Sequence, residues 1–111
     1  MIAQELEVSL HMAFVEARQK RHELITVEHL LLAMLDNASA AQVLRSCNVD
    51  IDELRQVVTA FVDKHTPSVA GEEDVDTQPT VGFQRVIQRA ILHVQSAQKK
   101  EVSGANILAA L

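Results

Sequence analysis

Apolar residues recur at three- and four-residue steps along most of this 111-residue chain, which is the period of an amphipathic helix. The first stripe comprises Leu6, Leu10, Ala13, Phe14 and Ala17 and predicts a helix over about residues 3–20. A similar stripe later in the chain comprises Phe83, Val86, Ile87, Ala90, Ile91 and Val94 and predicts a helix over about residues 81–98. Each of these helices is expected to bury one face.

The segment over about residues 27–36 is apolar on almost all sides and predicts a helix that has no polar face to expose to solvent. Thr26 is placed to cap its first turn, and Glu28 lies near the positive end of its dipole. Asp36 and Asn37 end the pattern. We therefore expect this helix to form the buried centre of the fold.

Three further helices complete the pattern. One is predicted over about residues 39–46, beginning at Ser39, and one over about 51–64, where Asp50 and Glu53 have the spacing of a capping box. The apolar face of the latter comprises Leu54, Val57, Val58, Phe61 and Val62. A last helix over 104–111 begins after Ser103, and residues 66–79, rich in Pro, Ser, Gly and acids, predict a mobile surface loop.

The two ends of the chain are similar to each other at a separation of 77 residues. Leu6, Leu10 and Ala13 correspond to Phe83, Ile87 and Ala90, and Thr26 corresponds to Ser103. This predicts an all-α fold built by pseudo-twofold duplication of a four-helix unit. Repeat one would span 1–65, the acidic loop 66–79, and a partial repeat two 80–111, whose last helices we expect to be missing from this sequence.

Composition narrows the possible functions. Apolar residues make up 48% of the chain and the only aromatic residues are three Phe, so the core must be mostly aliphatic, which suits packed helices. A net charge of −5 with scattered Lys and Arg argues against nucleic acid as a partner. The N-terminus has no signal-peptide pattern, no apolar run is long enough for a membrane span, and the single Cys47 fits a reducing cytoplasm. Cys47 is expected to be a buried small hydrophobe, and Met12 and Met34 are expected in the core.

No pattern of catalytic, metal-binding or cofactor-binding residues stands out. His22 and Glu23 begin like an H-E-x-x-H zinc helix, but Thr26 occupies the position of the second histidine. His29, beside a run of leucines, is expected to be a hydrogen-bonded core residue. The chain lacks a nucleotide-binding G-x-x-x-x-G-K-[ST] loop. We expect a non-catalytic binding domain with no metal and no cofactor.

Three segments carry a resemblance to a known family: Thr-Val-Glu-His-Leu-Leu-Leu at 26–32, Phe-Gln-Arg-Val at 83–86 and Gly-Ala-Asn-Ile-Leu at 104–108. The chain resembles the N-terminal domain of Clp-type protein unfoldases, and among these the ClpA type. The resemblance implies two pseudo-twofold repeats of four helices, attached to an AAA+ ATPase ring that unfolds proteins for the ClpP peptidase. It also implies that the domain binds ClpS, the adaptor that delivers N-degron substrates.

The resemblance implies an adaptor-binding site formed by Glu23, Glu28, Thr80 and Arg85. Each residue also has an ordinary structural explanation. Glu28 suits a helix dipole, Thr80 suits a cap, and Glu23 and Arg85 suit solvated faces. We expect reversal of charge at Glu23 or Arg85 to weaken adaptor binding without unfolding the domain.

Other functions stay open at this stage. A ClpB- or ClpC-like domain would bind unfolded substrates or another adaptor directly. A hydrolase using scattered histidines and acids would require a stoichiometric metal, and a helical dimerisation module would show a monomer–dimer equilibrium. The resemblance favours an isolated domain that is monomeric, cytoplasmic and free of nucleic acid and membrane contacts.

Overall fold

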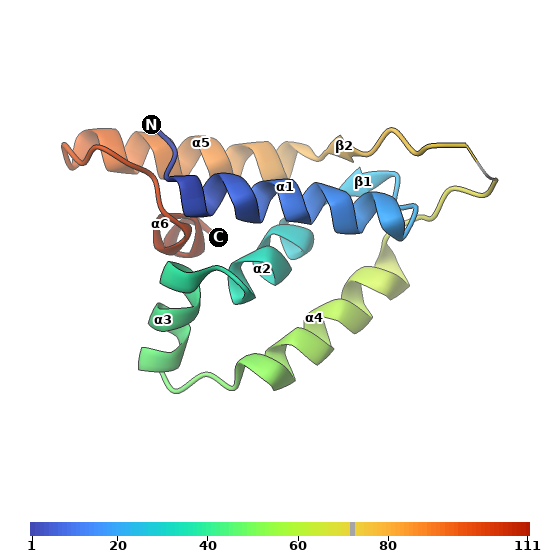
Figure 1. The fold of residues 1–111 in the computed structure, drawn as a ribbon, viewed down its shortest axis with the longest axis horizontal. Coiled ribbons are helices and arrows are strands. Elements are labelled where there is room, and N and C mark those ends of the chain that lie inside the picture. The colour runs from blue at the N-terminus through green and yellow to red at the C-terminus, as the bar shows by residue number, and fades with distance from the viewer. Residues whose placement is uncertain (72) are drawn as a thin grey trace.

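A computed structural model describes residues 1–71 and 73–111, which form a helical assembly with one small sheet (Figure 1). The helices are α1 (Gln4–Gln19), α2 (Val27–Leu35), α3 (Ala38–Ser46), α4 (Ile51–His65), α5 (Val81–Ser96) and α6 (Gly104–Ala110). The strands β1 (Leu24–Ile25) and β2 (Gln78–Pro79) each contain two residues. The all-α prediction is therefore confirmed, with a short strand pair that the periodicity did not indicate.

Helix α2 is the centre of the molecule, as its nearly continuous apolar sequence predicted. It contacts each of the other five helices, and its Leu30 and Met34 are fully buried. Helices α1 and α5 lie along one side of it, whereas α3 and α4 extend away on the other side (Figure 1). The core is largely aliphatic, and the one contact between phenylalanine rings is the edge-to-face pair of Phe14 and Phe83, with centroids 5.8 Å apart.

Side-chain caps explain most of the helix starts. The side chains of Thr26, Asp50, Thr80 and Ser103 accept hydrogen bonds from the backbone N–H groups of His29, Glu53, Phe83 and Asn106, as the sequence predicted for each cap. Helix α3 begins at Ala38, one residue before the predicted start at Ser39, and Asn37 caps it. Asn37 Oδ1 accepts from the Ala40 N–H at 3.1 Å, which starts the helix earlier.

A polar junction joins the starts of α1, α3 and α6. The Glu5 carboxylate accepts from the Gly104 N–H at 3.0 Å and from the Ser39 hydroxyl at 3.1 Å, while Ser39 accepts from the Ala105 N–H. The amide of Asn37 donates to the Ser9 hydroxyl at 3.0 Å. The Ser39 hydroxyl therefore stabilises the start of α6 as well as contacting α1.

Backbone contacts repeat at the 77-residue separation seen in the sequence. Ile25 pairs with Pro79 in the parallel sheet, and Val102 pairs with Ile2 in an isolated parallel bridge. Ile25 is equivalent to Val102 and Pro79 is equivalent to Ile2, so the same two positions are paired twice, with the two halves of the chain exchanged. A pseudo-twofold axis produces this pattern. Arg21 and Gln98, also 77 residues apart, both have a left-handed φ of 58°.

Both ends of the predicted acidic loop are hydrogen-bonded to the turn after α1. Val69 N–H donates to Arg21 O at 2.8 Å, and the Thr77 hydroxyl donates to His22 O at 2.8 Å. Glu72, one of the four acids of that loop, lies outside the described residues. The 66–79 segment is therefore attached to the body near each of its ends.

Several predictions of burial were wrong. Cys47 is exposed, because it is the C-cap of α3 and lies beyond the buried Ala40–Ala41 face of that helix. Met12 is 46% exposed, although Met34 is fully buried as predicted. On α4, Val57 and Phe61 are 62% and 46% exposed, so the buried stripe is narrower than the apolar one.

In the part of the chain that the structure describes, no helix has both the length and the hydropathy needed to cross a bilayer.

Candidate functional site

The parallel pairing of β1 and β2 determines where the four predicted adaptor-binding residues lie. Glu23 immediately precedes β1 and Thr80 immediately follows β2, while Glu28 and Arg85 lie in the first two turns of α2 and α5. The two strands run side by side into the starts of these two helices (Figure 1). We call this edge, comprising residues 23–28 and 78–85, the strand–helix rim.

Backbone hydrogen bonds fix the two halves of the rim against each other. Gln78 N–H donates to Glu23 O and Thr80 N–H donates to Ile25 O, both at 3.0 Å. A β-carbon added at Gly82 would lie 3.2 Å from a methyl group of Val27, so α2 and α5 are close at their first turns. The structure thus brings Glu23, Thr80 and the first turn of α2 to one edge, with Arg85 one turn further along α5.

The rim presents charged groups that are not used within the fold. Glu23 and Arg85 are exposed and Glu28 is half-buried. Within the described ranges, none of these three side chains takes part in a hydrogen bond or ion pair of the structure. Thr80 differs, because its hydroxyl already accepts the Phe83 N–H at 3.1 Å. The carboxylates and the guanidinium are therefore available to a partner.

Two buried histidines support the rim from beneath. His29 Nδ1 accepts the backbone N–H of Thr26 at 2.9 Å, so its proton resides on Nε2. His29 Nε2 in turn lies 2.9 Å from His22 Nδ1 and donates to it. His22 also holds the segment before β2 through the bond from Thr77 to its carbonyl oxygen. The pair therefore links the turn before β1, the cap of α2 and the approach to β2.

Burial keeps both histidines neutral. It lowers the pKa of His29 to about 4, helped by the neighbouring His22, and Glu28 opposes this shift. The pKa of His22 is also lowered, first by burial and then by Lys20. The core role predicted for His29 is confirmed. The burial of His22 was missed, because the sequence around it resembled an exposed polar turn.

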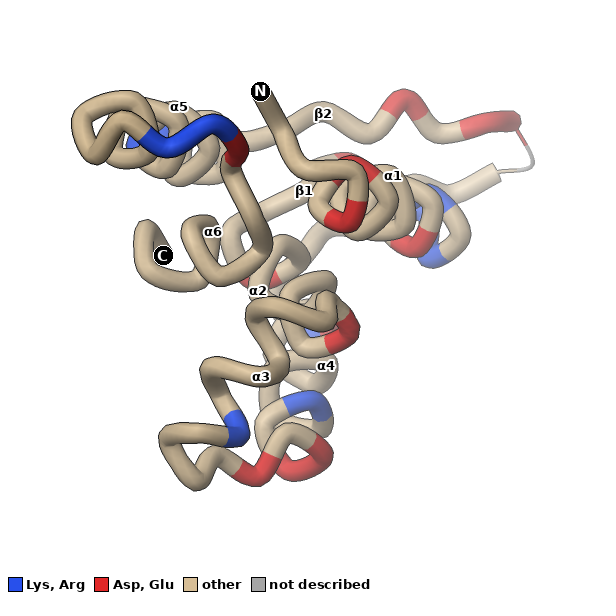
Figure 2. The backbone as a smooth tube through the Cα atoms, turned by 60° about the vertical axis from the view of Figure 1, so that its left-hand side comes forward, with Lys and Arg blue, Asp and Glu red and all other residues tan. Residues whose placement is uncertain are grey.

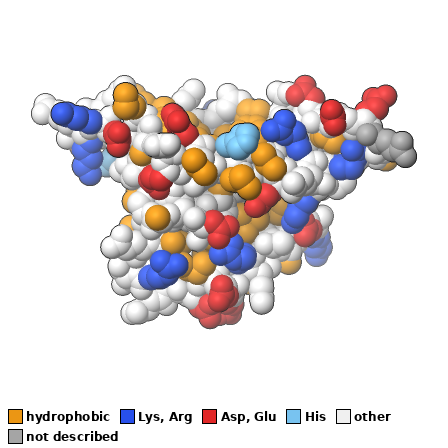
Figure 3. All heavy atoms as spheres, in the orientation of Figure 1, with side chains coloured by type: hydrophobic (Ala, Val, Ile, Leu, Met, Phe, Trp, Pro, Cys, Tyr) orange, Lys and Arg blue, Asp and Glu red, His pale blue; other side chains and the backbone are white. Residues whose placement is uncertain are grey.

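Charges of both signs lie across the surface of the domain. Acidic residues lie along the segment that leads into β2 (Figure 2). Charges of both signs are interspersed on the face seen in Figure 3. Over the described residues, no group of three His, Cys, Asp or Glu side chains is arranged to hold a metal ion. The rim offers hydrogen-bonding and ion-pairing groups at a surface, which is the chemistry of docking.

Comparison with known proteins identifies the family of this chain. The family model described as the Clp repeat (R) N-terminal domain matches residues 1–111. A curated relative, the ClpA homolog protein of Fuscovulum blasticum, is 47% identical over 107 residues, which is 96% of this chain. The chain spans only 14% of the length of that relative.

Solved structures share the fold at low sequence identity. The Hsp104 N-terminal domain from Candida albicans matches with a TM-score of 0.82 and 16% identity, covering 98% of this chain and 71% of that one. The ClpV N-domain in complex with a VipB peptide matches with a TM-score of 0.78 and 19% identity, covering 98% and 66%. Because the family model matches every residue from 1 to 111, this chain belongs to the Clp repeat (R) N-terminal domain family.

Proposed function

We propose that this chain is the adaptor-docking domain of a ClpA-type AAA+ unfoldase and that it binds a ClpS-type adaptor through the strand–helix rim. The observation that carries the proposal is the β1–β2 pairing, which brings Glu23, Glu28 and Thr80 to one edge. The domain itself does no chemistry. It works in the cytoplasm, and the adaptor it holds brings N-degron substrates to the ring and to ClpP.

The charges of the rim define the partner surface it fits. Glu23 and Glu28 require cationic or N–H donor groups opposite β1 and α2, whereas Arg85 requires a carboxylate or carbonyl opposite α5. Charge-assisted hydrogen bonds of this kind contribute roughly 1.5–3 kcal/mol each when well formed, and much less when they stay exposed. A partner with both kinds of group in that order binds, and a uniformly charged partner does not.

The family supports the proposal at a coarser level. The relative named a ClpA homolog has 47% identity to this chain, which favours a ClpA-type partner. The complex of a ClpV N-domain with a VipB peptide is a case in which a domain of this fold holds a protein segment. The ATPase ring, ClpP and the degradation of substrates concern the whole protein, and we propose them on the same basis.

Calorimetric titration of the 111-residue chain with a purified ClpS adaptor tests the proposal. We expect saturable binding with one adaptor per chain, and about tenfold weaker binding, or 1.4 kcal/mol, for Glu23→Lys and for Arg85→Glu. The exposed residues Lys100 and Glu101 lie outside the rim, so Lys100→Glu and Glu101→Lys serve as matched controls with unchanged affinity.

Unchanged affinity in both rim variants would remove the rim from the site. Failure of the unaltered chain to bind the adaptor, together with binding of a permanently unfolded protein, would instead favour the ClpB- or ClpC-like function. The exposed apolar side chains of Val8 and Met12 on α1 and Phe61 on α4 are the groups that such direct binding would use.

A further inference from the structure

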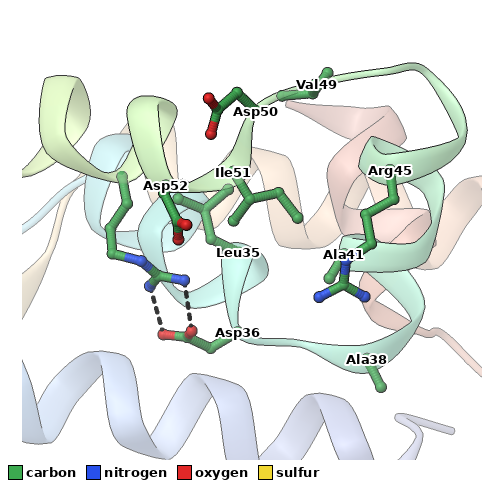
Figure 4. Close-up of a pocket in the computed structure, with 10 residues that line it drawn as sticks. Leu35, Asp36, Ala38, Ala41, Arg45, Val49, Asp50, Ile51 and Asp52 are labelled. Carbon is green, nitrogen blue, oxygen red and sulfur yellow. Dashed lines mark hydrogen bonds and ion pairs between the residues drawn. The ribbon is translucent and has the colours of Figure 1, made fainter.

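A second surface hollow lies at the other end of α2 from the strand–helix rim. Its volume is about 600 Å³, and it is enclosed by the end of α2, helix α3, the connection from α3 to α4 and the first turns of α4 (Figure 4). We call it the α3–α4 cavity. Its size falls within the range of known ligand-binding pockets. The four adaptor-binding candidates do not line it.

One ion pair in the cavity belongs to the fold. Arg55 of α4 forms a bidentate pair with Asp36 at the end of α2, with nitrogen–oxygen distances of 2.9 and 3.0 Å (Figure 4). This fork–fork geometry fixes both side chains and joins the two helices. Arg55 therefore has little capacity left for a ligand.

A second arginine in the cavity has no such partner. Arg45 projects from α3 on the side of the cavity opposite Asp52 (Figure 4), and the two ion pairs found in the described part of the chain do not include it. The opposite side, formed by the end of α2 and the start of α4, carries Asp36, Asp50 and Asp52 against the single cation of Arg55. The cavity therefore has one basic wall and one wall with excess acid.

Apolar side chains lie between these two walls. Leu35 and Ile51 lie between Arg45 and Asp52 (Figure 4). Leu35 and Ala41 are only 2% and 3% exposed, so the half-buried Ile51 is the more accessible apolar group of the three. An apolar ligand group at this place would contact carbon atoms, with a cation available on one side and carboxylates on the other. Three acids lining one cavity disfavour a phosphate backbone.

We propose that the α3–α4 cavity binds a short protein segment in which an apolar side chain lies between an acidic and a basic residue. The acidic residue pairs with Arg45, the apolar side chain packs on Ile51, and the basic residue pairs with Asp52. This contact is separate from adaptor docking at the rim, and it gives the domain a second place to hold a protein chain.

Amide chemical-shift titration of the ¹⁵N-labelled chain tests this with two capped pentapeptides, Gly-Glu-Leu-Lys-Gly and its reverse-order counterpart Gly-Lys-Leu-Glu-Gly. We expect at least one of the two peptides to cause saturable shifts, confined to residues 35–55. Arg45→Gln should weaken binding about tenfold. Arg18→Gln, which removes an exposed arginine on α1, should leave it unchanged. Replacing the peptide's leucine by serine, or its two charged residues by glutamine, should also weaken binding about tenfold.

The proposal is overturned if neither peptide shifts the resonances of residues 35–55, or if Arg45→Gln and Arg18→Gln bind equally well. Equal binding of free leucine would also overturn it, since the cavity would then hold a small zwitterion rather than a protein segment. Adaptor binding measured on the Arg45→Gln variant keeps the two proposals distinct, because rim docking should be unaffected.

Discussion

At the scale of single residues, the hydrogen-bonded pair of His22 and His29 ties the stability of the rim to pH. Both imidazoles are buried. Because His29 Nδ1 accepts the backbone N–H of Thr26, the one ring N–H of neutral His29 is on Nε2, which faces His22. Protonating either ring would place a charge in a site built for neutral groups. Of the nearby charges, Lys20 also disfavours protonation, whereas Glu28 and Asp63 favour it but do not outweigh burial.

We therefore predict that the domain loses stability as the pH falls from 6.5 towards 4. The unfolded chain takes up a proton at His29 near its ordinary pKa of 6.5, but the folded chain does so only at about 4. Between these values the unfolded state binds more protons, so the free energy of unfolding decreases as the pH is lowered, by on the order of 3 kcal/mol from this residue. Urea denaturation at a series of pH values measures it.

The matched variant for this prediction is His29→Asn. At the corresponding position of α6, Asn106 accepts the backbone N–H of Ser103 at 2.8 Å, so an asparagine can fill the capping role without titrating. We expect the fall in unfolding free energy between pH 6.5 and 4 to be much shallower in this variant. An equal fall in both proteins would show that the histidine pair does not control it.

A glycine in the polar junction gives a second prediction at this scale. A β-carbon on Gly104 would lie 1.9 Å from Oδ1 of Asn37, which is itself held by its cap and by Ser9. Gly104→Ala should lower the free energy of unfolding by about 1–3 kcal/mol, measured by thermal or urea denaturation. Gly82→Ala is the comparison, because there only a methyl group of Val27 at 3.2 Å must shift and the helix gains propensity. Equal effects of the two substitutions would contradict the close packing at Asn37.

At the scale of elements, α4 shows how a long apolar stripe can be buried on only part of its width. Val62 is 1% exposed and Val57 is 62% exposed, although both belong to the same predicted face. Helix α4 packs on α2 and touches α3. Its outer flank, including the neighbouring rings of Phe61 and His65, which are tilted at 36° to each other, faces solvent.

This difference predicts unequal costs for the same truncation in one helix. Val62→Ala removes fully buried methyl groups and should lower the free energy of unfolding by about 1–3 kcal/mol. Val57→Ala should change it by less than about 0.5 kcal/mol, because its side chain is already in water. Comparable losses measured by urea denaturation would mean that the outer flank of α4 is covered.

The sequence was most informative where a periodic pattern ended at a capping residue. Thr26, Asp50, Thr80 and Ser103 cap the helices predicted for them. It was least informative where the outcome depended on distant partners. Ser39 is an equally good cap by type, but its hydroxyl is engaged by Glu5 and the start of α6, and these contacts link segments that are far apart in the chain.

The candidate rim could be located only in part from the sequence. The strands β1 and β2 have two residues each, too few for an alternating pattern, so nothing local indicated that Glu23 and Thr80 would lie along one sheet edge. Periodicity likewise gave no sign that the exposed-looking His22 would be buried beneath it. The α3–α4 cavity arises from the angle between helices, which periodicity does not determine.

At the scale of the whole molecule, the central helix α2 separates two candidate binding surfaces. Its first turn carries Glu28 of the rim, and its last residue, Leu35, lines the α3–α4 cavity. Seven residue steps of helix from Glu28 to Leu35 place the two about 10 Å apart along the axis. A partner on one surface therefore leaves room for a short segment on the other.

The most direct test of the docking proposal is amide chemical-shift mapping of the ¹⁵N-labelled chain during titration with an unlabelled ClpS adaptor. Docking at the strand–helix rim predicts that the largest changes fall on residues 23–28 and 78–85, and that Glu23→Lys reduces them at equal adaptor concentration. Changes centred on residues 35–55, or no changes at all, would contradict docking at the strand–helix rim.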